Sequence, residues 1–349
     1  MEKQEIYARL PQALLPWYQA NRRELPWRQD KDPYHIWVSE IMLQQTRVEA
    51  VKGYYTRFLD ALPTLEALAA ADDERLHKLW EGLGYYSRVR NLKKAAVQIM
   101  DRHGGVFPVT HKEVSDLACI GPYTAGAICS IAYDLPTPAV DGNVLRVVSR
   151  LTDDDTPIES TAFRKEITEC LAAVYPPIAG DFTQALMELG ATVCGPNRKP
   201  DCVQCPCKDF CLGHIRGTAE VLPVKKAKPQ RRMEDKTVFI LSCDGWYALC
   251  KRPDTGLLAG LWEFPNVPDK LELAEAIAEV ERMGLKPRDI LRRVEKKHIF
   301  THVQWNMHGV YMELKEKAGD FVWMDAVRIN AEAALPTAFR QFWEETQYV

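Results

Sequence analysis

The stretch LACIGPYTAGAICSIAY, residues 117–133, decides how the first half of the chain folds. A short apolar segment leads to Gly121-Pro122, a pair that marks a turn, and a helical pattern follows over about 124–133. A glycine at such a turn lets the backbone approach a ligand closely, because no side chain stands in the way. Taken alone, however, a glycine turn between two short helices is more often a simple connector.

Helical patterns continue on both sides of this turn. In YHIWVSEIMLQQTRVEAV (34–51), apolar residues recur at helical spacing, and Asp32-Pro33 marks its start. Similar amphipathic stretches cover roughly 64–80, 88–102, 113–119, 143–151, 161–174 and 181–193. No convincing strand occurs before about residue 216. The sequence therefore predicts an all-α domain of many short helices over residues 1–216.

The composition changes after Gly217, and the periodicity then becomes strand-like. The stretch LPVKKAKPQRRMEDK (222–236) holds six Lys and Arg residues and two prolines, which predicts an exposed linker over 217–236. A solvated connector is favoured there over a dedicated DNA tether. Residues 237–349 predict an α+β domain, because KTVFILSCDGWYALCKR (236–252) is typical of a hairpin around Asp-Gly. Further strands are expected at 308–314 and 320–325, and helices at 271–285 and 336–345.

Charge and composition bound the function. The chain has 349 residues, with 45 Lys and Arg against 48 Asp and Glu, a net charge of −3. This argues against coating nucleic acid or acidic membranes through bulk charge, although a local basic surface stays possible. The amino terminus is charged, and no stretch approaches about 18 apolar residues, so neither a signal peptide nor a membrane span is expected. We expect a cytoplasmic protein, in which thiols stay reduced.

Five of the ten cysteines lie between Cys194 and Cys211. The spacing is Cys194-x7-Cys202-x2-Cys205-x5-Cys211, with Cys207 as an extra thiol. Clustered thiols in a reducing compartment indicate metal ligation. A structural zinc site usually has two CxxC pairs or one CxxC with two histidines. One CxxC with unequal outer spacings favours an iron–sulfur cube over zinc.

Two acidic residues stand out by their neighbours. Asp141, in VDGNVLRVVSR (140–150), precedes a probable helix start, where an N-terminal cap is worth about 1 kcal/mol. Glu40 lies among apolar residues in WVSEIMLQQTRV (37–48). Burial of Glu40 would raise its pKa and keep a proton available. The pattern alone, however, favours an exposed helical glutamate.

Motifs along the whole chain resemble those of the endonuclease III superfamily of DNA glycosylases, and most closely its MutY-type adenine DNA glycosylases. They are LPWR (25–28), VSEIMLQQTRV (38–48), LWEGLGYYSRVRNL (79–92), GPYTAGA (121–127), VDGNVLRV (140–147) and the cysteine loop. The resemblance implies a helix–hairpin–helix glycosylase domain with a 4Fe-4S cluster. Its ligands would be Cys194, Cys202, Cys205 and Cys211, although the first spacing is one residue longer than the family's.

The same resemblance implies roles for single residues. Asp141 would stabilise the positive charge that develops on the sugar, and Glu40 would protonate the leaving purine. Tyr123 and Asn143 would support the aspartate, and Gly121 with Tyr123 would meet the DNA backbone. Tyr123 also stands where strand-cutting members carry a lysine that forms a Schiff base, which implies a monofunctional enzyme. Arg28 and Gln184 are expected to contact the extruded adenine. Gln45 and Tyr85 are expected to act as wedges in the duplex.

The second domain resembles the Nudix (MutT-like) family through TGLLAGLWEFPNV (255–267). Its helix IAEVERMGL (277–285) keeps Glu281 but lacks other magnesium-binding residues of that family, which argues against hydrolysis. IFTHVQW (299–305) resembles the loop with which MutY-type enzymes read 8-oxoguanine. That resemblance assigns this recognition to Phe300, Thr301 and His302.

We therefore expect a monomeric, monofunctional DNA glycosylase of base excision repair. Its partner would be double-stranded DNA with adenine opposite 8-oxoguanine or guanine, so that it associates with the nucleoid when bound. Three alternatives stay open. They are a glycosylase/lyase for oxidised pyrimidines, a non-catalytic iron–sulfur sensor of DNA damage, and a Nudix pyrophosphohydrolase.

Overall fold

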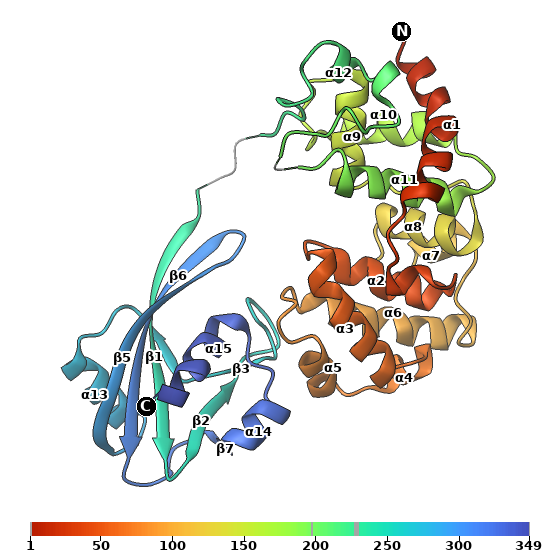
Figure 1. Cartoon of the computed structure of the whole chain (residues 1–349). Coiled ribbons are helices and arrows are strands. Elements are labelled where there is room, and N and C mark those ends of the chain that lie inside the picture. The colour runs from red at the N-terminus through yellow and green to blue at the C-terminus, as the bar shows by residue number, and fades with distance from the viewer. Residues whose placement is uncertain (1, 197, 227–229, 349) are drawn as a thin grey trace. The chain divides into compact units, whose positions relative to one another are not determined.

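The computed structural model describes residues 2–196, 198–226 and 230–348 (Figure 1). The chain divides into two compact units, Met1–Ala70 with Asn91–Ala227, and Ala71–Arg90 with Lys228–Val349. The predicted boundaries at 216 and 237 stay a prediction. Part of the predicted linker, 227–229, lies outside the described residues. The linker's last residues belong to a strand that begins at Arg232.

The first unit is helical, and its described residues contain no strand, as the sequence predicts. Its elements are α1 (Lys3–Asn21), η1 (Pro26–Arg28), α2 (Pro33–Leu43), α3 (Val48–Ala61), α4 (Leu65–Ala70), α6 (Ser87–His103, beginning in the second unit), α7 (His111–Ser115), α8 (Pro122–Tyr133), α9 (Gly142–Thr152), α10 (Thr161–Ala172), α11 (Ala179–Thr192), η2 (Lys208–Phe210) and α12 (Leu212–Ile215). The continuous pattern predicted over 34–51 is wrong in one respect, because α2 and α3 are separate helices. Gln45 between them has a φ of 59°, a left-handed conformation that interrupts a helix but leaves the apolar spacing unchanged.

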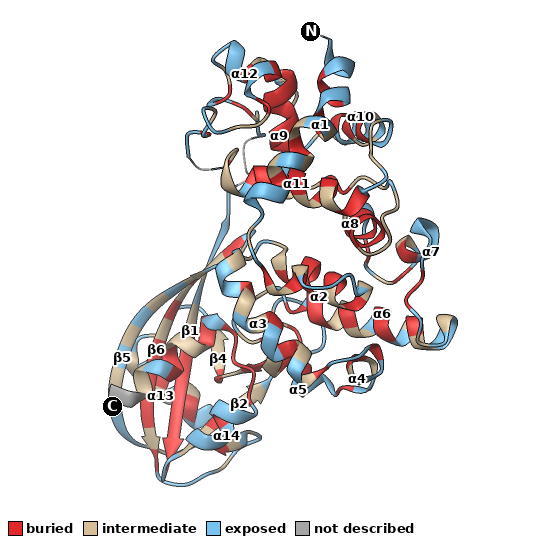
Figure 2. Cartoon of the chain, turned by 45° about the vertical axis from the view of Figure 1, so that its right-hand side comes forward, coloured by how far each residue is buried: buried red, intermediate tan, exposed pale blue. Residues whose placement is uncertain are grey.

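Helix α11 lies at the centre of this unit and packs against α1, α8 and α9. Fully buried side chains from these helices, among them Leu10, Val147 and Phe182, form its core. Figure 2 shows most of α8 and α9 as buried. Gly126 in α8 permits one close contact, because a Cβ there would lie 2.2 Å from the carbonyl oxygen of Pro138. The chain leading to Asp141 is therefore held directly against α8.

The second unit is built on a mixed sheet. Its elements are α5 (Asp73–Leu79), β1 (Arg232–Cys243), β2 (Trp246–Lys251), β3 (Trp262–Glu263), β4 (Asn266–Pro268), α13 (Leu273–Arg282), β5 (Pro287–Ile299), β6 (Val303–Leu314), β7 (Val322–Asp325), α14 (Ala326–Ala331), α15 (Thr337–Trp343) and η3 (Glu344–Tyr348). The strand order is β3-β2-β1-β6-β5, with β4 paired to β1 and β7 paired to β2. Only the pair of β1 and β6 is parallel among these strands.

Both faces of this sheet are covered, α13 on one and α15 on the other (Figure 1). The predicted hairpin over 236–252 is confirmed, with Asp244 and Gly245 both left-handed at its turn. The strands and helices predicted later in this domain are also confirmed. Strand β5 was not predicted, because PRDILRRVEKKHI is rich in charge. That composition suits a strand at the edge of a sheet, where charges oppose pairing with other chains.

Residues 71–90 belong to this unit through polar contacts. Glu81 accepts hydrogen bonds from the backbone N–H of Leu335 (2.9 Å) and from Arg340, whose Nη2 lies 2.7 Å away. Lys251 pairs with Glu74 at 2.6 Å. No helix within the described ranges is both long and apolar enough to cross a membrane.

Candidate active site

Glu40 is held on α2 with its side chain turned into the protein, and it is 5% exposed. The pattern-based reading of an exposed helical glutamate is therefore wrong. The hydroxyl of Tyr123, from the first turn of α8, donates a hydrogen bond to its Oε2 at 2.6 Å. Burial raises the pKa of Glu40 to about 7, and the charge of Asp141 adds to this, while the Tyr123 hydrogen bond and Arg28 act in the opposite direction. Glu40 thus carries a proton close to neutral pH, as a general acid requires.

Asp141 is the N-cap of α9. Its Oδ1 accepts the backbone N–H groups of Asn143 (2.9 Å) and Val144 (2.8 Å), and its Oδ2 accepts the side-chain amide of Asn143 at 2.6 Å. These donors fix the carboxylate, and the helix N-terminus favours its negative charge. The N-cap hydrogen bonds of α9 therefore also fix the position of the Asp141 carboxylate. Tyr123, expected to support this aspartate, instead donates its hydroxyl to Glu40.

A second buried carboxylate, Glu188 on α11, was not among the predicted site residues. Its side chain is 0% exposed and accepts hydrogen bonds from Arg23 (Nε at 2.5 Å, Nη2 at 3.1 Å) and Arg28 (Nη2 at 2.8 Å). Burial opposes its ionisation, but the two guanidinium groups outweigh burial and lower its pKa. One acid within the apolar stretch FTQALMELG was the available signal. Gln184, expected at the adenine, lies half-buried four residues earlier and therefore on the same side of α11.

Left-handed backbone marks three positions of the motifs expected to contact DNA. Gln45 (φ 59°), Tyr85 (φ 47°) and Cys119 (φ 59°) all lack the freedom of glycine, and such conformations cost on the order of 1 kcal/mol or more each. The expected wedges Gln45 and Tyr85 are both exposed. Gly121 is the exposed N-cap of α8, and a Cβ built there would meet nothing within 4 Å. The space beside the Gly121 backbone is therefore open.

The three residues expected to read 8-oxoguanine form the turn between β5 and β6. Phe300 is anchored by edge-on ring contacts with His298 (4.6 Å) and Trp305 (4.8 Å), while Thr301 and His302 are exposed. The hydroxyls of Thr301 and Tyr85 lie 2.9 Å apart, both within the second unit. A wedge candidate and a recognition candidate are therefore in contact.

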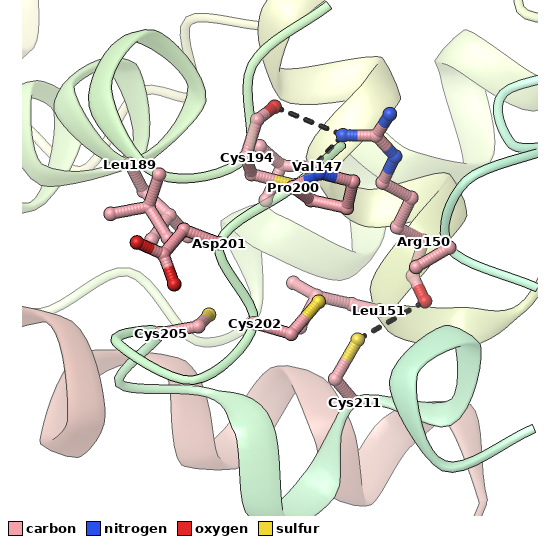
Figure 3. Close-up of a pocket in the computed structure, with 12 residues that line it drawn as sticks. Val147, Arg150, Leu151, Leu189, Cys194, Pro200, Asp201, Cys202, Cys205 and Cys211 are labelled. Atoms are coloured by element: carbon pink, nitrogen blue, oxygen red, sulfur yellow. Dashed lines mark hydrogen bonds between the residues drawn. The ribbon is translucent and has the colours of Figure 1, made fainter. Parts of the chain in front are cut away.

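Four cysteines surround a cavity between α9, α11 and the loop that follows (Figure 3). They are the four predicted ligands, Cys194, Cys202, Cys205 and Cys211. Burial raises the pKa of Cys211 to about 11 and also raises the pKa of Cys194 and Cys202, whereas a hydrogen bond from Cys207 lowers the pKa of Cys205. Metal ligation requires the deprotonated form of each thiol. The remaining thiol, Cys207, is fully buried in the core and does not line the cavity. No group of three His, Cys, Asp or Glu side chains within the described residues is placed to hold a single metal ion.

Two buried arginines of α9 join this cavity to the acidic site. Arg150 Nη1 donates to the Cys194 sulfur at 3.2 Å and to the Cys194 carbonyl at 3.1 Å. Arg146 donates from Nε to the same carbonyl at 2.9 Å and from Nη2 to the Asn143 side chain at 3.1 Å. Neither arginine was predicted, because their partners are brought together only by the packing of α9 on α11.

Comparisons with known proteins give the class to which this helical unit, with its buried acid on α2 and its four-cysteine loop, belongs, namely the base-excision DNA glycosylases. Residues 38–172 match the HhH-GPD superfamily of base excision DNA repair proteins, and residues 237–345 match the NUDIX domain. The adenine DNA glycosylase of Rattus norvegicus is 37% identical over 95% of this chain and 73% of its own length, and that of Mus musculus is 32% identical over 96% and 78%. The human adenine DNA glycosylase is 35% identical over 86% of this chain and 66% of its own length.

The chain therefore belongs to the adenine DNA glycosylase family, enzymes that remove adenine in base excision repair. Among solved structures, a thermostable thymine-DNA glycosylase matches with a TM-score of 0.55 and 28% identity, over 61% of this chain and 97% of that one. A DNA-trapped endonuclease III matches with a TM-score of 0.52 and 22% identity, over 62% and 99%, which shows the fold alone.

Proposed function

We propose that this enzyme removes adenine from duplex DNA where adenine lies opposite 8-oxoguanine or guanine, and leaves an abasic site. The observation that carries the proposal is the buried Glu40 carboxyl, protonated near neutral pH and close enough to Asp141 to be affected by its charge. One carboxylic acid and one carboxylate beside each other are what glycosidic cleavage requires.

The proposed reaction follows from these two states. Glu40 gives its proton to the flipped adenine while the bond between base and sugar breaks, and the electron pair of that bond leaves with the base. Asp141, held by Asn143 and the α9 backbone, stabilises the positive charge on the sugar. Water then adds to the sugar carbon and releases a proton. No amine stands at position 123, so cleavage of the strand through a Schiff base is not expected.

We assign recognition of the opposite base to Phe300, Thr301 and His302. Their place at the turn between two long strands supports this, because the strands hold the turn rigidly while two of its side chains remain exposed. Gln45 and Tyr85 would enter the duplex, and Arg28 with Gln184 would contact the extruded adenine. We expect a monomer that acts in the cytoplasm.

A 4Fe-4S cluster is the cofactor that fits the four-cysteine cavity best. Four thiols from one loop line it, and the Arg150 guanidinium lies against one sulfur, where it would offset thiolate charge. Cys194, Cys202, Cys205 and Cys211 would hold the cluster. Bound there, such a cluster would supply one-electron redox chemistry and would cross-link the four cysteines of the loop. Iron and sulfide analysis of purified protein tests this against zinc.

The function is tested by base release from labelled duplexes with 8-oxoguanine:adenine, guanine:adenine and 8-oxoguanine:cytosine pairs. We expect release from the first two pairs only. Glu40→Gln is expected to lower release by about 10²- to 10⁴-fold while binding to the duplex is retained. Glu49→Gln, at an exposed glutamate of α3, is the matched control. Near-normal release by Glu40→Gln would contradict the mechanism, and a strong borohydride-trapped adduct would favour a lyase.

A further inference from the structure

Three contacts hold the Arg28 side chain. Its ion-pair partner is Glu188, which lies far away in the sequence. Its Nη2 lies 2.8 Å from Glu188 Oε2, its Nη1 donates to the Arg23 carbonyl at 3.2 Å, and its guanidinium lies 5.5 Å from the centre of the Tyr18 ring. Arg23 completes the arrangement with two hydrogen bonds to the same carboxylate. One buried negative charge therefore holds two positive charges.

The charge of the same arginine also acts on Glu40. Three groups on three elements act on it, namely Tyr123 of α8 through its hydroxyl, Asp141 at the start of α9 through its charge, and Arg28 of η1 through its charge. Of these, only Arg28 is a cation. A cation in direct contact with a carboxylate keeps that carboxylate ionised. An Arg28 that turned to Glu40 would remove the proton that the proposed reaction needs.

We propose that Glu188 is a positioning residue that keeps Arg28 out of an ion pair with Glu40 and so preserves the Glu40 proton. This inference rests on the proposed function, because it assumes that Glu40 is the acid. The physical reason is competition between two buried carboxyl groups for one guanidinium. Glu188 wins because Arg23 and Arg28 both donate to it, which offsets the cost of burying its charge. Glu40, held by a neutral hydroxyl, is then the group that stays protonated.

The inference predicts what happens when the competitor loses its charge. In Glu188→Gln, the side chain keeps its shape, but Arg28 and Arg23 face an amide in place of a carboxylate. Arg28 is then expected to turn towards Glu40. The loss of the Glu188 charge acts in the same direction, since one negative charge fewer makes ionisation of Glu40 easier. Both effects lower the pKa of the general acid.

The test is the pH dependence of single-turnover adenine release between pH 5 and 9, with saturating holoenzyme. For Glu188→Gln we expect the limb on which the rate falls with rising pH to move about one unit or more to lower pH. Above pH 7 the loss is then about tenfold, and it is recovered as the pH is lowered. Glu188→Asp, which keeps the charge, is expected to stay close to the wild-type limb.

A second variant separates positioning from structure. Adding Arg28→Met to Glu188→Gln removes the cation, so the limb is expected to return towards its wild-type position even if the maximal rate is lower. Asp154→Asn is the matched control, because it breaks another acid–base pair of the same unit, with Lys3 at 2.6 Å, away from Glu40. It is expected to leave the pH profile unchanged.

Two results would overturn the inference. One is a Glu188→Gln profile that falls equally at all pH values, the behaviour of a structural residue. The other is a limb that stays shifted in the double variant. Failure of the proposed function is visible separately, because Glu40→Gln would then release adenine and the wild-type limb would not depend on residue 40.

Discussion

Glu40 and Glu188 are alike in sequence and opposite in chemistry. Each is an acid within an apolar helical stretch, and they are 5% and 0% exposed. Glu40 meets a tyrosine hydroxyl, and burial raises its pKa to about 7. Glu188 meets two guanidinium groups, which lower its pKa despite equal or deeper burial. Burial thus sets the cost of a charge, and the partner decides whether the group keeps its proton or its charge.

The comparison also explains why the two sites depend on each other. Arg28 contacts Glu188 directly, whereas it affects the pKa of Glu40 only through its charge. Burial is the main cause of the raised pKa of Glu40, and the proposed role of Glu188 is to keep the Arg28 cation from opposing it. Substitutions at the two sites separate their effects, and the largest expected change is at Glu188.

Removing the Glu188 carboxylate is expected to have the largest effect on stability. Glu188→Ala leaves Arg23 and Arg28 beside a cavity without their counter-charge, and breaking such a buried pair costs about 3 to 4 kcal/mol. Arg23 is 36% exposed and regains some hydration, which keeps the value at the lower end. Urea unfolding at pH 7, at equal metal content, measures the change. A loss below about 1 kcal/mol would show that the pair contributes little.

Replacing Glu40 is expected to act in the opposite direction. Because the folded protein raises the pKa of Glu40 from 4.5 to about 7, wild-type stability from this group is complete below pH 4.5 and is lost as the pH rises through 7. The loss amounts to about 3 kcal/mol above pH 7. Glu40→Gln has no such loss and is expected to be more stable than wild type at pH 8. The difference is expected to shrink towards pH 5, and an equal difference at both pH values would contradict it.

Tyr123→Phe is expected to give the smallest change. The Tyr123 hydrogen bond lowers the pKa of Glu40, so its removal is expected to move the rate-against-pH limb upward by about one unit or less, opposite to Glu188→Gln. The variant then keeps a larger share of its own maximal rate at pH 8 than wild type does. Tyr133→Phe is the control on the same helix, since its hydroxyl donates to the Phe107 carbonyl instead. A downward movement of the limb would show that the hydroxyl acts differently.

Prediction from sequence succeeded where the evidence was local. Helical spacing, the Asp-Gly turn at 244–245 and the strands over 308–314 and 320–325 are properties of neighbouring residues, and the structure contains them. The four cysteines chosen by spacing line one cavity. Prediction failed where the pattern of residue types did not reveal the backbone conformation or the pairing of a strand. The helix break at Gln45 does not disturb the apolar spacing. The charged segment that forms β5 is explained as a strand only by its place at the edge of the sheet.

The sequence by itself determined which residue types were available and in which order. It supplied the glycine turn, the cysteine loop and the acids at 40 and 141. Only the tertiary structure decided which acid keeps its proton and which keeps its charge. Packing of α2, α8, η1 and α11 gave Glu40 a hydroxyl and Glu188 two arginines. Since the pKa of a buried carboxyl depends on atoms far away in sequence, no pattern along the chain could tell the acid that holds its proton from the acid that holds its charge.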